Sequence, residues 1–227
     1  MTKKENDTSD RRPLQLRSWR WLQALATWMT GAGISPNAIS VVSIFIALAC
    51  AMVLSATAYV DAGNRALWAA AVLLMLLRVL ANTLDGMVAV EHGKATRVGL
   101  LYNEVPDRIA DAMILIGAGY AYSGDVTLGY LAACIALFVA YVRTLAKNAG
   151  APSDFRGVMN KRGRVLTLLA VSVYMAAAPT AWQFAWGPDD QWGVAALALL
   201  IICAGGVYTA AWRLKIAGRY LRTHTQD

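Results

Sequence analysis

Six long apolar runs dominate this chain and limit the folds open to it. They lie at about 37–59, 66–90, 98–121, 126–148, 163–183 and 192–214, and each is long enough to cross a bilayer as an α-helix. Of the 227 residues, 58% are hydrophobic and only 15% are charged, which is typical of a polytopic membrane protein. The sequence therefore predicts an all-α protein whose main domain, residues 31–215, holds six transmembrane helices.

The two ends of the chain are more polar than these runs. Residues 1–12 are predicted to be a disordered cytoplasmic tail, and residues 216–227 a second cytoplasmic tail. Residues 13–30 place apolar side chains such as Leu14 and Trp21 on one side and arginines towards the other. This pattern predicts an amphipathic helix on the membrane surface, with a solvated terminal helix as the alternative.

Positive charge gathers in one set of connections. Lys and Arg residues cluster before residue 37, in 91–97, in 143–164 and from 213 onward, whereas Arg65 alone lies in the other connections. By the positive-inside rule, both termini and the 91–97 hinge are predicted to lie in the cytoplasm. The membrane is expected to be a bacterial-type inner (cytoplasmic) membrane. The net charge of +7 therefore indicates contact with membrane lipids and not with nucleic acid.

Polar side chains interrupt the second and third runs near the 91–97 hinge. At 3.6 residues per turn they form one stripe on each helix, and the hinge turns the two stripes towards each other. The stripes consist of Arg78, Asn82 and Asp85 on the first helix and Asn103, Asp107 and Asp111 on the second. Polar residues inside a membrane are costly and indicate function. Oxygen ligands from two helices, without a Cys or His cluster, suit Mg²⁺ or Mn²⁺.

Two ion pairs are expected around these stripes. Arg78 and Asp111 lie about one turn deeper than the other members, at similar depth, and we expect them to form a buried pair beneath a metal site. The alternative is that Asp111 is an additional metal ligand. Glu104 and Arg108, spaced i and i+4, predict a local pair away from the main face.

The stripes resemble the signature of the CDP-alcohol phosphotransferase (CDP-alcohol phosphatidyltransferase) family. That signature is D-x-x-D-G-x-x-A-R, then eight to twelve residues, then G-x-x-x-D-x-x-x-D. With an eight-residue spacer the matching positions are Asp85, Gly86, Ala89, Gly99 and Asp107.

Three signature positions differ in this chain. Asn82 replaces the first Asp, Val90 the Arg, and Asn103 the third Asp. A twelve-residue spacer would instead place Asp107 and Asp111 on the last two acids and would lose the second Gly. Each Asp-to-Asn exchange removes one negative charge, so two metal ions become harder to hold.

The resemblance implies transfer of a phosphatidyl or other substituted phosphate group in phospholipid biosynthesis. The donor is a CDP-alcohol, expected to be CDP-diacylglycerol; an alcohol acceptor attacks it, and CMP is released. By the family pattern Asp107 is the general base. The residues expected to hold the divalent ion are Asp85, Asp107, Asn82 and Asn103, with Asp111 as a further candidate.

Nucleotide contacts and a possible homodimer follow from the same resemblance. Gly86, Ala89 and Gly99 would leave room for the cytidine nucleotide, and Lys94 or Arg97 would replace the phosphate contact of the family Arg.

The connection between the fourth and fifth runs is rich in cations. Those expected to bind the acceptor or lipid phosphate are Arg143, Lys147, Arg156, Lys161 and Arg164. The alternative is a basic loop that only sets topology and is attracted to anionic headgroups.

Two other functions are compatible with the sequence. A catalytically inactive family member could bind lipid or nucleotide as a membrane scaffold, since two signature Asp positions are Asn. A small transporter is supported only by the buried charges, and the absence of inverted halves argues against it.

Overall fold

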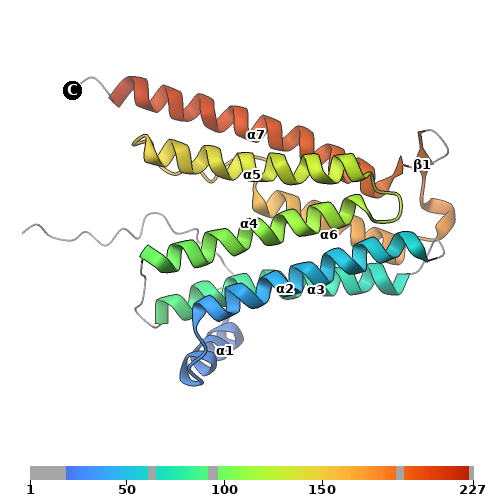
Figure 1. The fold of residues 1–227 in the computed structure, drawn as a ribbon, viewed down its shortest axis with the longest axis horizontal. Helices are drawn as coiled ribbons and strands as arrows, with labels where there is room; N and C mark the ends of the chain where they lie inside the picture. Colours follow the sequence, from blue (N-terminus) through green and yellow to red (C-terminus); the bar gives the residue numbers. More distant parts are fainter. Residues whose placement is uncertain (1–18, 61–64, 92–96, 188–191, 225–227) are drawn as a thin grey trace, which may run out of the picture.

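The computed structural model describes residues 19–60, 65–91, 97–187 and 192–224, which form a bundle of long α-helices (Figure 1). The helices are α1 (Arg20–Gly31), α2 (Pro36–Ala56), α3 (Arg65–Glu91), α4 (Arg97–Gly119), α5 (Val126–Asn148), α6 (Lys161–Ala177) and α7 (Val194–His224). Short 3-10 turns η2 (Thr57–Tyr59) and η3 (Thr180–Trp182) and a two-stranded antiparallel hairpin, β1 (Ala185–Trp186) with β2 (Trp192–Gly193), complete the described part. The predicted all-α class is confirmed for the described residues, and the small hairpin was not predicted.

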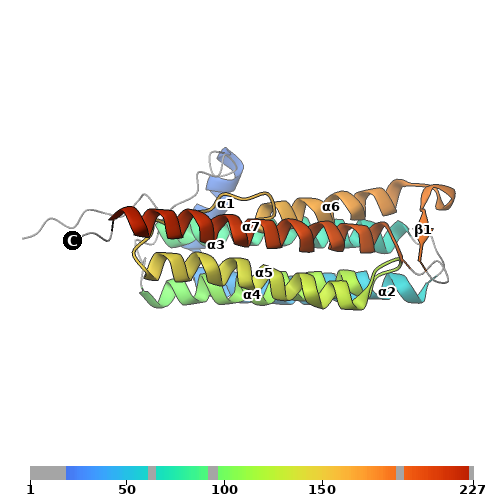
Figure 2. The ribbon, with the colours of Figure 1, turned by 90° about the horizontal axis from the view of Figure 1, so that it is seen from above.

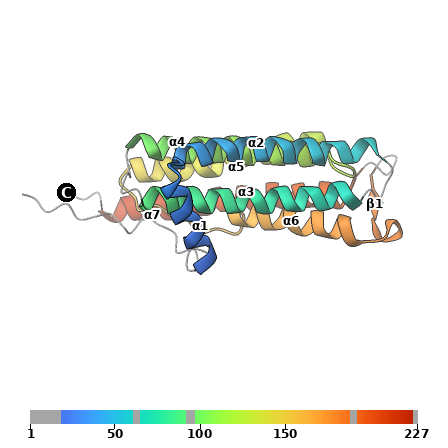
Figure 3. The ribbon, with the colours of Figure 1, turned by 90° about the horizontal axis from the view of Figure 1, so that it is seen from below.

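The six long helices form two layers. α2, α4 and α5 make one layer and α3, α6 and α7 the other, as the views from above and from below show (Figures 2 and 3). Around the bundle each helix packs on the next in the order α2, α4, α5, α7, α6, α3 and back to α2. The core between the layers is lined by small and branched apolar residues such as Ala110, Leu115 and Leu199. This closed arrangement brings α3, α4 and α6 together although they are far apart in sequence.

Four helices in the described part have both the length and the hydropathy of a membrane span. They are Pro36–Tyr59, Arg65–Ala89, Val126–Asn148 and Val194–His224. α4 carries the polar stripe, and α6 is only 17 residues long. The helices thus confirm an integral membrane protein, and crossing of the bilayer by α4 and α6 stays a prediction.

The ends of the last two helices differ from the expected boundaries. α6 ends at Ala177, before the predicted limit of 183, and η3 and the hairpin follow it. α7 continues to His224, so most of the predicted tail 216–227 is helical. The apolar run of α7 ends earlier than the helix does, because Lys215, Arg219 and Arg222 extend it as a basic helix.

α1 lies across one end of the bundle and packs on α3 (Figures 1 and 3). It buries Leu22 and Ala26, while Trp19, Trp21 and Trp28 are exposed. The described helix begins at Arg20, and the remainder of the predicted helix 13–30, with the tail 1–12, lies outside the described residues. Exposed tryptophans beside the bundle suit a membrane interface, so the interfacial role of α1 stays a prediction.

Glycine allows the closest approach between α2 and α4. A Cβ atom at Gly117 would lie 2.5 Å from the Cα of Ala51 and 2.8 Å from its Cβ, distances that real Cβ atoms do not reach. At the same end of α4, a Cβ at Gly119 would lie 2.9 Å from the Cα of Gly129 on α5. These glycines let α4 contact both neighbours in its layer and fix the position of its polar stripe.

Candidate functional site

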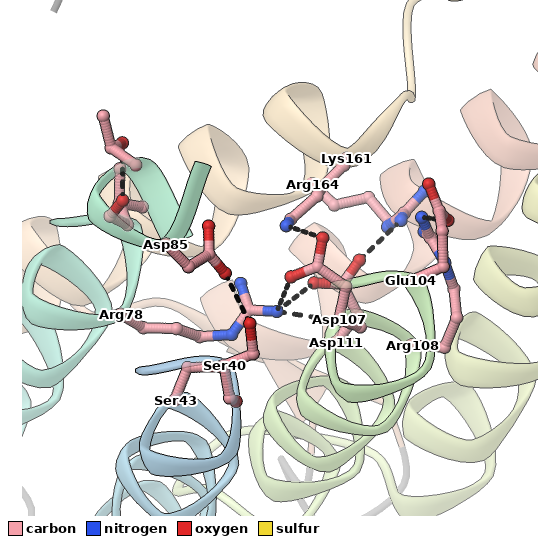
Figure 4. Close-up of polar contacts among 12 residues, drawn as sticks. Ser40, Ser43, Arg78, Asp85, Glu104, Asp107, Arg108, Asp111, Lys161 and Arg164 are labelled. Carbon is pink, nitrogen blue, oxygen red and sulfur yellow. Dashed lines mark hydrogen bonds and ion pairs between the residues drawn. The ribbon is translucent and has the colours of Figure 1, made fainter. Parts of the chain in front are cut away.

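A buried ion pair joins the two polar stripes. Arg78 on α3 contacts Asp111 on α4, Nη2 to Oδ1, at 2.9 Å, and Arg78 is only 1% exposed (Figure 4). The second oxygen of Asp111 accepts a hydrogen bond from Nη2 of Arg164 on α6 at 2.8 Å. The predicted Arg78–Asp111 pair is confirmed, with Arg164 as an unforeseen third member. Since both carboxylate oxygens are paired, the contacts favour a structural role for Asp111 over metal ligation.

Asp107 lies one turn from Asp111 on the same face of α4. Its Oδ2 accepts from the Nζ of Lys161, the first residue of α6, at 2.5 Å. Its Oδ1 lies 3.6 Å from Nη2 of Arg78, which also donates to the Asp107 backbone carbonyl at 3.3 Å. Two cations from two other helices therefore hold the residue that the family pattern makes the general base.

Asp85 faces this cluster from α3. Its carboxylate and the two aspartates of α4 lie on opposite sides of the Arg78 guanidinium (Figure 4). The Oγ of Ser40 on α2 donates to Oδ2 of Asp85 at 2.9 Å, while Oδ1 is buried without a hydrogen-bond partner among the described residues. An unpartnered buried carboxylate oxygen is costly and indicates a missing ligand or water.

The other predicted site residues of the two stripes are less enclosed. Asn82, Gly86 and Ala89 are half-buried on α3, and Asn103 is exposed on α4. Lys94 lies outside the described residues, as do the side chains of the first α4 residues, so the predicted roles of Arg97 and Gly99 stay predictions. Val90 belongs to the last turn of α3, and its side chain likewise lies outside the described part.

A second network lies beside the aspartates. Glu104 accepts from Nη2 of Arg108 at 2.6 Å, which confirms the predicted i, i+4 pair. Its other oxygen accepts from Nη2 of Arg143 on α5 at 2.8 Å. The Arg143 guanidinium also lies 5.0 Å from the centre of the Phe155 ring. Arg143, a predicted phosphate ligand, therefore links α4, α5 and the following loop.

The start of α6 is positioned by a cap. The Asn160 side chain accepts from the backbone N–H groups of Arg162 and Gly163, as an N-cap residue does. Lys161 and Arg164 then follow at a spacing of three, on one face of the helix. Because α6 begins part-way along the bundle, this face meets the aspartates of α4 (Figures 1 and 4).

α7 holds the loop that leads to this cap. Thr209 Oγ1 accepts from the backbone N–H of Met159 at 3.0 Å, and Arg213 Nε donates to the Arg156 carbonyl at 3.1 Å. A Cβ at Gly157, whose φ is +128°, would clash with the Thr209 side chain, so the loop lies against the helix. These contacts fix the position from which Lys161 reaches Asp107.

Arg156, another predicted phosphate ligand, is exposed and pairs with Asp154 at 3.0 Å. Partial burial raises the pKa of Asp154, but hydrogen bonds and charge from Arg156 outweigh it and leave that pKa below its usual value. Lys147, the remaining predicted phosphate ligand, is exposed near the end of α5.

A small cavity of about 20 Å³ lies directly beside the Arg78–Asp111 pair, with Arg164 in its wall. The Nε groups of Arg78 and Arg164 are buried without a partner among the described residues. A cavity of this size holds roughly one water molecule. It is too small for a substrate group.

Three residues of the site were not predicted. Ser40 sits in an otherwise apolar helix, and its spacing of three from Ser43 was the available signal of a polar face. Thr209 and Arg213 lie in the last apolar run, where an arginine within a span points to a buried partner.

The sequence profile of the CDP-alcohol phosphatidyltransferase family matches residues 33–208 of this chain, from just before α2 to α7. A phosphatidylinositol phosphate synthase of Mycobacteroides abscessus is 23% identical over 164 residues, which cover 70% of each protein.

Crystal structures of the phosphatidylinositol phosphate synthase of Mycobacterium tuberculosis have the same fold. The form with CDP-DAG bound superposes with a TM-score of 0.67 at 18% identity, covering 88% of this chain and 94% of that one. The complex with manganese and citrate gives 0.69 at 19% identity, covering 86% and 88%.

Proposed function

The chain belongs to the CDP-alcohol phosphatidyltransferase family, a family of membrane transferases of phospholipid biosynthesis, and we propose that it transfers a phosphatidyl group from CDP-diacylglycerol to an alcohol with release of CMP. One observation carries the proposal. Asp85 of α3 and Asp107 of α4, both at matching signature positions, lie on opposite sides of the Arg78 guanidinium in one charged cluster.

A divalent cation, Mg²⁺ or Mn²⁺, is the cofactor that the family implies, and the residues fit one such ion. Asp85 Oδ1 is buried without a hydrogen-bond partner among the described residues, and Asp107 lies across the Arg78 guanidinium from it (Figure 4). Asp85 and Asp107 would hold the ion, with the amide oxygen of Asn82 as a further ligand and Asn103 at the exposed edge. In the described part of the chain no three His, Cys, Asp or Glu side chains gather as a metal cluster, so the amide oxygens and the substrate phosphate would have to complete the coordination of an ion. When bound, the ion would draw negative charge from phosphate oxygens.

Asp107 would accept the proton of the acceptor hydroxyl. A general base must be held within hydrogen-bond reach of the proton that it removes. Lys161 and Arg78 orient this carboxylate from both sides, at 2.5 and 3.6 Å. The same cations would stabilise phosphate oxygens that enter the cluster, because charge-assisted hydrogen bonds are strong in a site with little water.

Nucleotide and phosphate contacts complete the proposal. Gly86 and Ala89, both half-buried on α3, bring little or no side chain next to Asp85, and the cytidine nucleotide would lie there, with Gly99, Lys94 and Arg97 at the hinge. Arg143, Lys147, Arg156, Lys161 and Arg164 are the candidate phosphate ligands. Arg143, Arg156, Lys161 and Arg164 already pair with carboxylates, so a phosphate that binds there would have to share or displace a partner.

We also propose six membrane spans with both termini and the site on the cytoplasmic side of a bacterial-type inner membrane. The distribution of Lys and Arg supports this orientation, and α4 and α6 occupy places in the ring equivalent to those of the four apolar helices. A homodimer remains part of the proposal on family grounds alone.

The proposal is tested by CMP release. Purified protein in detergent is supplied with CDP-diacylglycerol, Mg²⁺ or Mn²⁺, and a panel of alcohols: inositol phosphate, which the names of relatives suggest, glycerol phosphate, inositol and serine. Acceptor-dependent CMP release with formation of a new phospholipid supports the transferase. CDP-diacylglycerol binding without CMP release with any acceptor favours the inactive scaffold.

A further inference from the structure

Lys161 is held against Asp107 as a fixed part of the site. The two side chains are 18% and 12% exposed, and the ammonium lies 2.5 Å from Oδ2. Lys161 is the first residue after the Asn160 cap, and the loop before the cap is fastened to α7 by Thr209 and Arg213. A lysine whose backbone is held in this way differs from a mobile surface lysine.

Within the cluster that α3, α4 and α6 form at the aspartates, the charges balance without a metal. Three buried carboxylates face three cations from α3 and α6. They are Asp85, Asp107 and Asp111, against Arg78, Lys161 and Arg164. The two amides, Asn82 and Asn103, add no charge at positions where the family signature has Asp. Hard dications are held by several anionic oxygens, so a neutral cluster has little capacity for two of them.

Within the proposed function, we propose that Lys161 is a built-in cation at Asp107, which takes the place of a second divalent ion and limits the site to one. The ammonium supplies one positive charge and three donors where a second metal would otherwise bridge Asp107. Its role is that of a positioning residue, since it holds Asp107 and shapes the charge that any phosphate meets.

The test is the number of Mn²⁺ ions bound per chain, measured from the electron paramagnetic resonance signal of free Mn²⁺ in a titration. Four proteins are compared: wild type, Lys161→Met, Lys161→Arg and Arg162→Met. Arg162 is the matched control, because it is the next residue, is exposed, and loses the same single charge.

We expect wild type, Lys161→Arg and Arg162→Met to bind no more than one Mn²⁺ per chain. Lys161→Met should bind an additional ion, or bind Mn²⁺ about tenfold more tightly. The reason is that removing a unit positive charge about 4 Å from a bound ion, at an effective dielectric constant of about 20, lowers the dissociation constant by more than a factor of ten. Two Mn²⁺ per wild-type chain, or equal binding by Lys161→Met and Arg162→Met, would overturn the proposal. Should Lys161→Met fail to fold, judged by its melting temperature, Lys161→Gln replaces it.

This test can fail separately from the proposed function. CMP release by a wild-type protein that binds two ions would sink the role of Lys161 and leave the transferase intact. A wild-type protein that binds one ion and never releases CMP would sink the transferase and leave the role of Lys161 intact.

Discussion

Arg78 and Asp111 lie 33 residues apart in sequence and form a buried ion pair of 2.9 Å between α3 and α4. Arg164 of α6 binds the other oxygen of Asp111 at 2.8 Å, so one carboxylate joins three helices. The pair lies one helical turn along α4 from Asp107, to which we assign the chemistry. Its integrity should therefore determine whether those residues meet at all.

Breaking this pair should destabilise the protein strongly. Arg78→Met leaves Asp111 with Arg164 alone, and Asp111→Asn leaves the buried Arg164 guanidinium without a carboxylate partner and Arg78 with only the 3.6 Å contact to Asp107. Removing one member of a buried pair costs about 3–5 kcal/mol. The double variant Arg78→Met/Asp111→Asn should melt at a higher temperature in detergent than the Asp111→Asn single variant, with incomplete recovery because Arg164 stays unpaired. Single variants that melt like wild type would show that the pairing does not hold the helices.

Ser40 should support Asp85 more than its neighbour Ser43 does. Ser40→Ala removes the side-chain hydrogen bond to the buried Asp85 carboxylate, whereas Ser43 Oγ donates to the Ser40 backbone carbonyl. A buried polar group left without a partner costs about 1–3 kcal/mol, and a charged group costs more. We expect Ser40→Ala to lower both the melting temperature and CMP release, and Ser43→Ala to change either one only slightly. Equal effects would mean that Ser40 has no special link to the site.

Gly117 should be sensitive to a single added methyl group. Gly117→Ala would place a Cβ 2.5 Å from the Cα of Ala51, and α4 would have to move away from α2. Overpacking of this kind costs about 1–3 kcal/mol. Gly218→Ala on α7 is the matched control, because a Cβ there meets nothing within 4 Å and alanine favours helix. The expected result is a lower melting temperature for Gly117→Ala and an equal or higher one for Gly218→Ala. The reverse order would place the close contact elsewhere.

The long helices could be predicted from the sequence, because a membrane helix is recognised by the length and hydropathy of its apolar run. The Arg78–Asp111 and Glu104–Arg108 pairs followed from helical spacing and from the cost of isolated charges in hydrocarbon. Lys161 was expected to bind phosphate, and its contact with Asp107 depends on where α6 begins, which a local pattern does not encode. The link from Ser40 to Asp85 spans 45 residues and arises from the packing of α2 on α3.

Two boundaries could not be read from hydropathy alone. The run 163–183 stays apolar past Ala177, where the helix nevertheless ends and leads into η3 and the hairpin. α7 continues beyond its apolar run, because Lys and Arg are good helix formers and the basic segment has no helix breaker other than Gly218.

Metal removal should abolish activity if Asp85 and Asp107 hold one divalent ion. After treatment with EDTA, CMP release should fall to background, and added Mg²⁺ or Mn²⁺ should restore it. The physical reason is that the Asp85 and Asp107 carboxylates would repel the anionic donor. A cation bound to them, at the Asp85 oxygen that has no partner among the described residues, would offset this repulsion. Undiminished CMP release in EDTA would mean that the protein cations alone carry the reaction.

The central claim is that Asp107 is the base of a phosphatidyl transfer, and the most direct measurement compares initial rates of CMP release from CDP-diacylglycerol. Asp107→Asn keeps the shape of the side chain and removes its charge. Asp125→Asn is the control, because Asp125 caps α5 outside the charged cluster and asparagine caps equally well. We predict a loss of about 100-fold or more for Asp107→Asn, as removal of a general base produces, and a rate for Asp125→Asn close to wild type. Equal rates for the two variants would contradict the account.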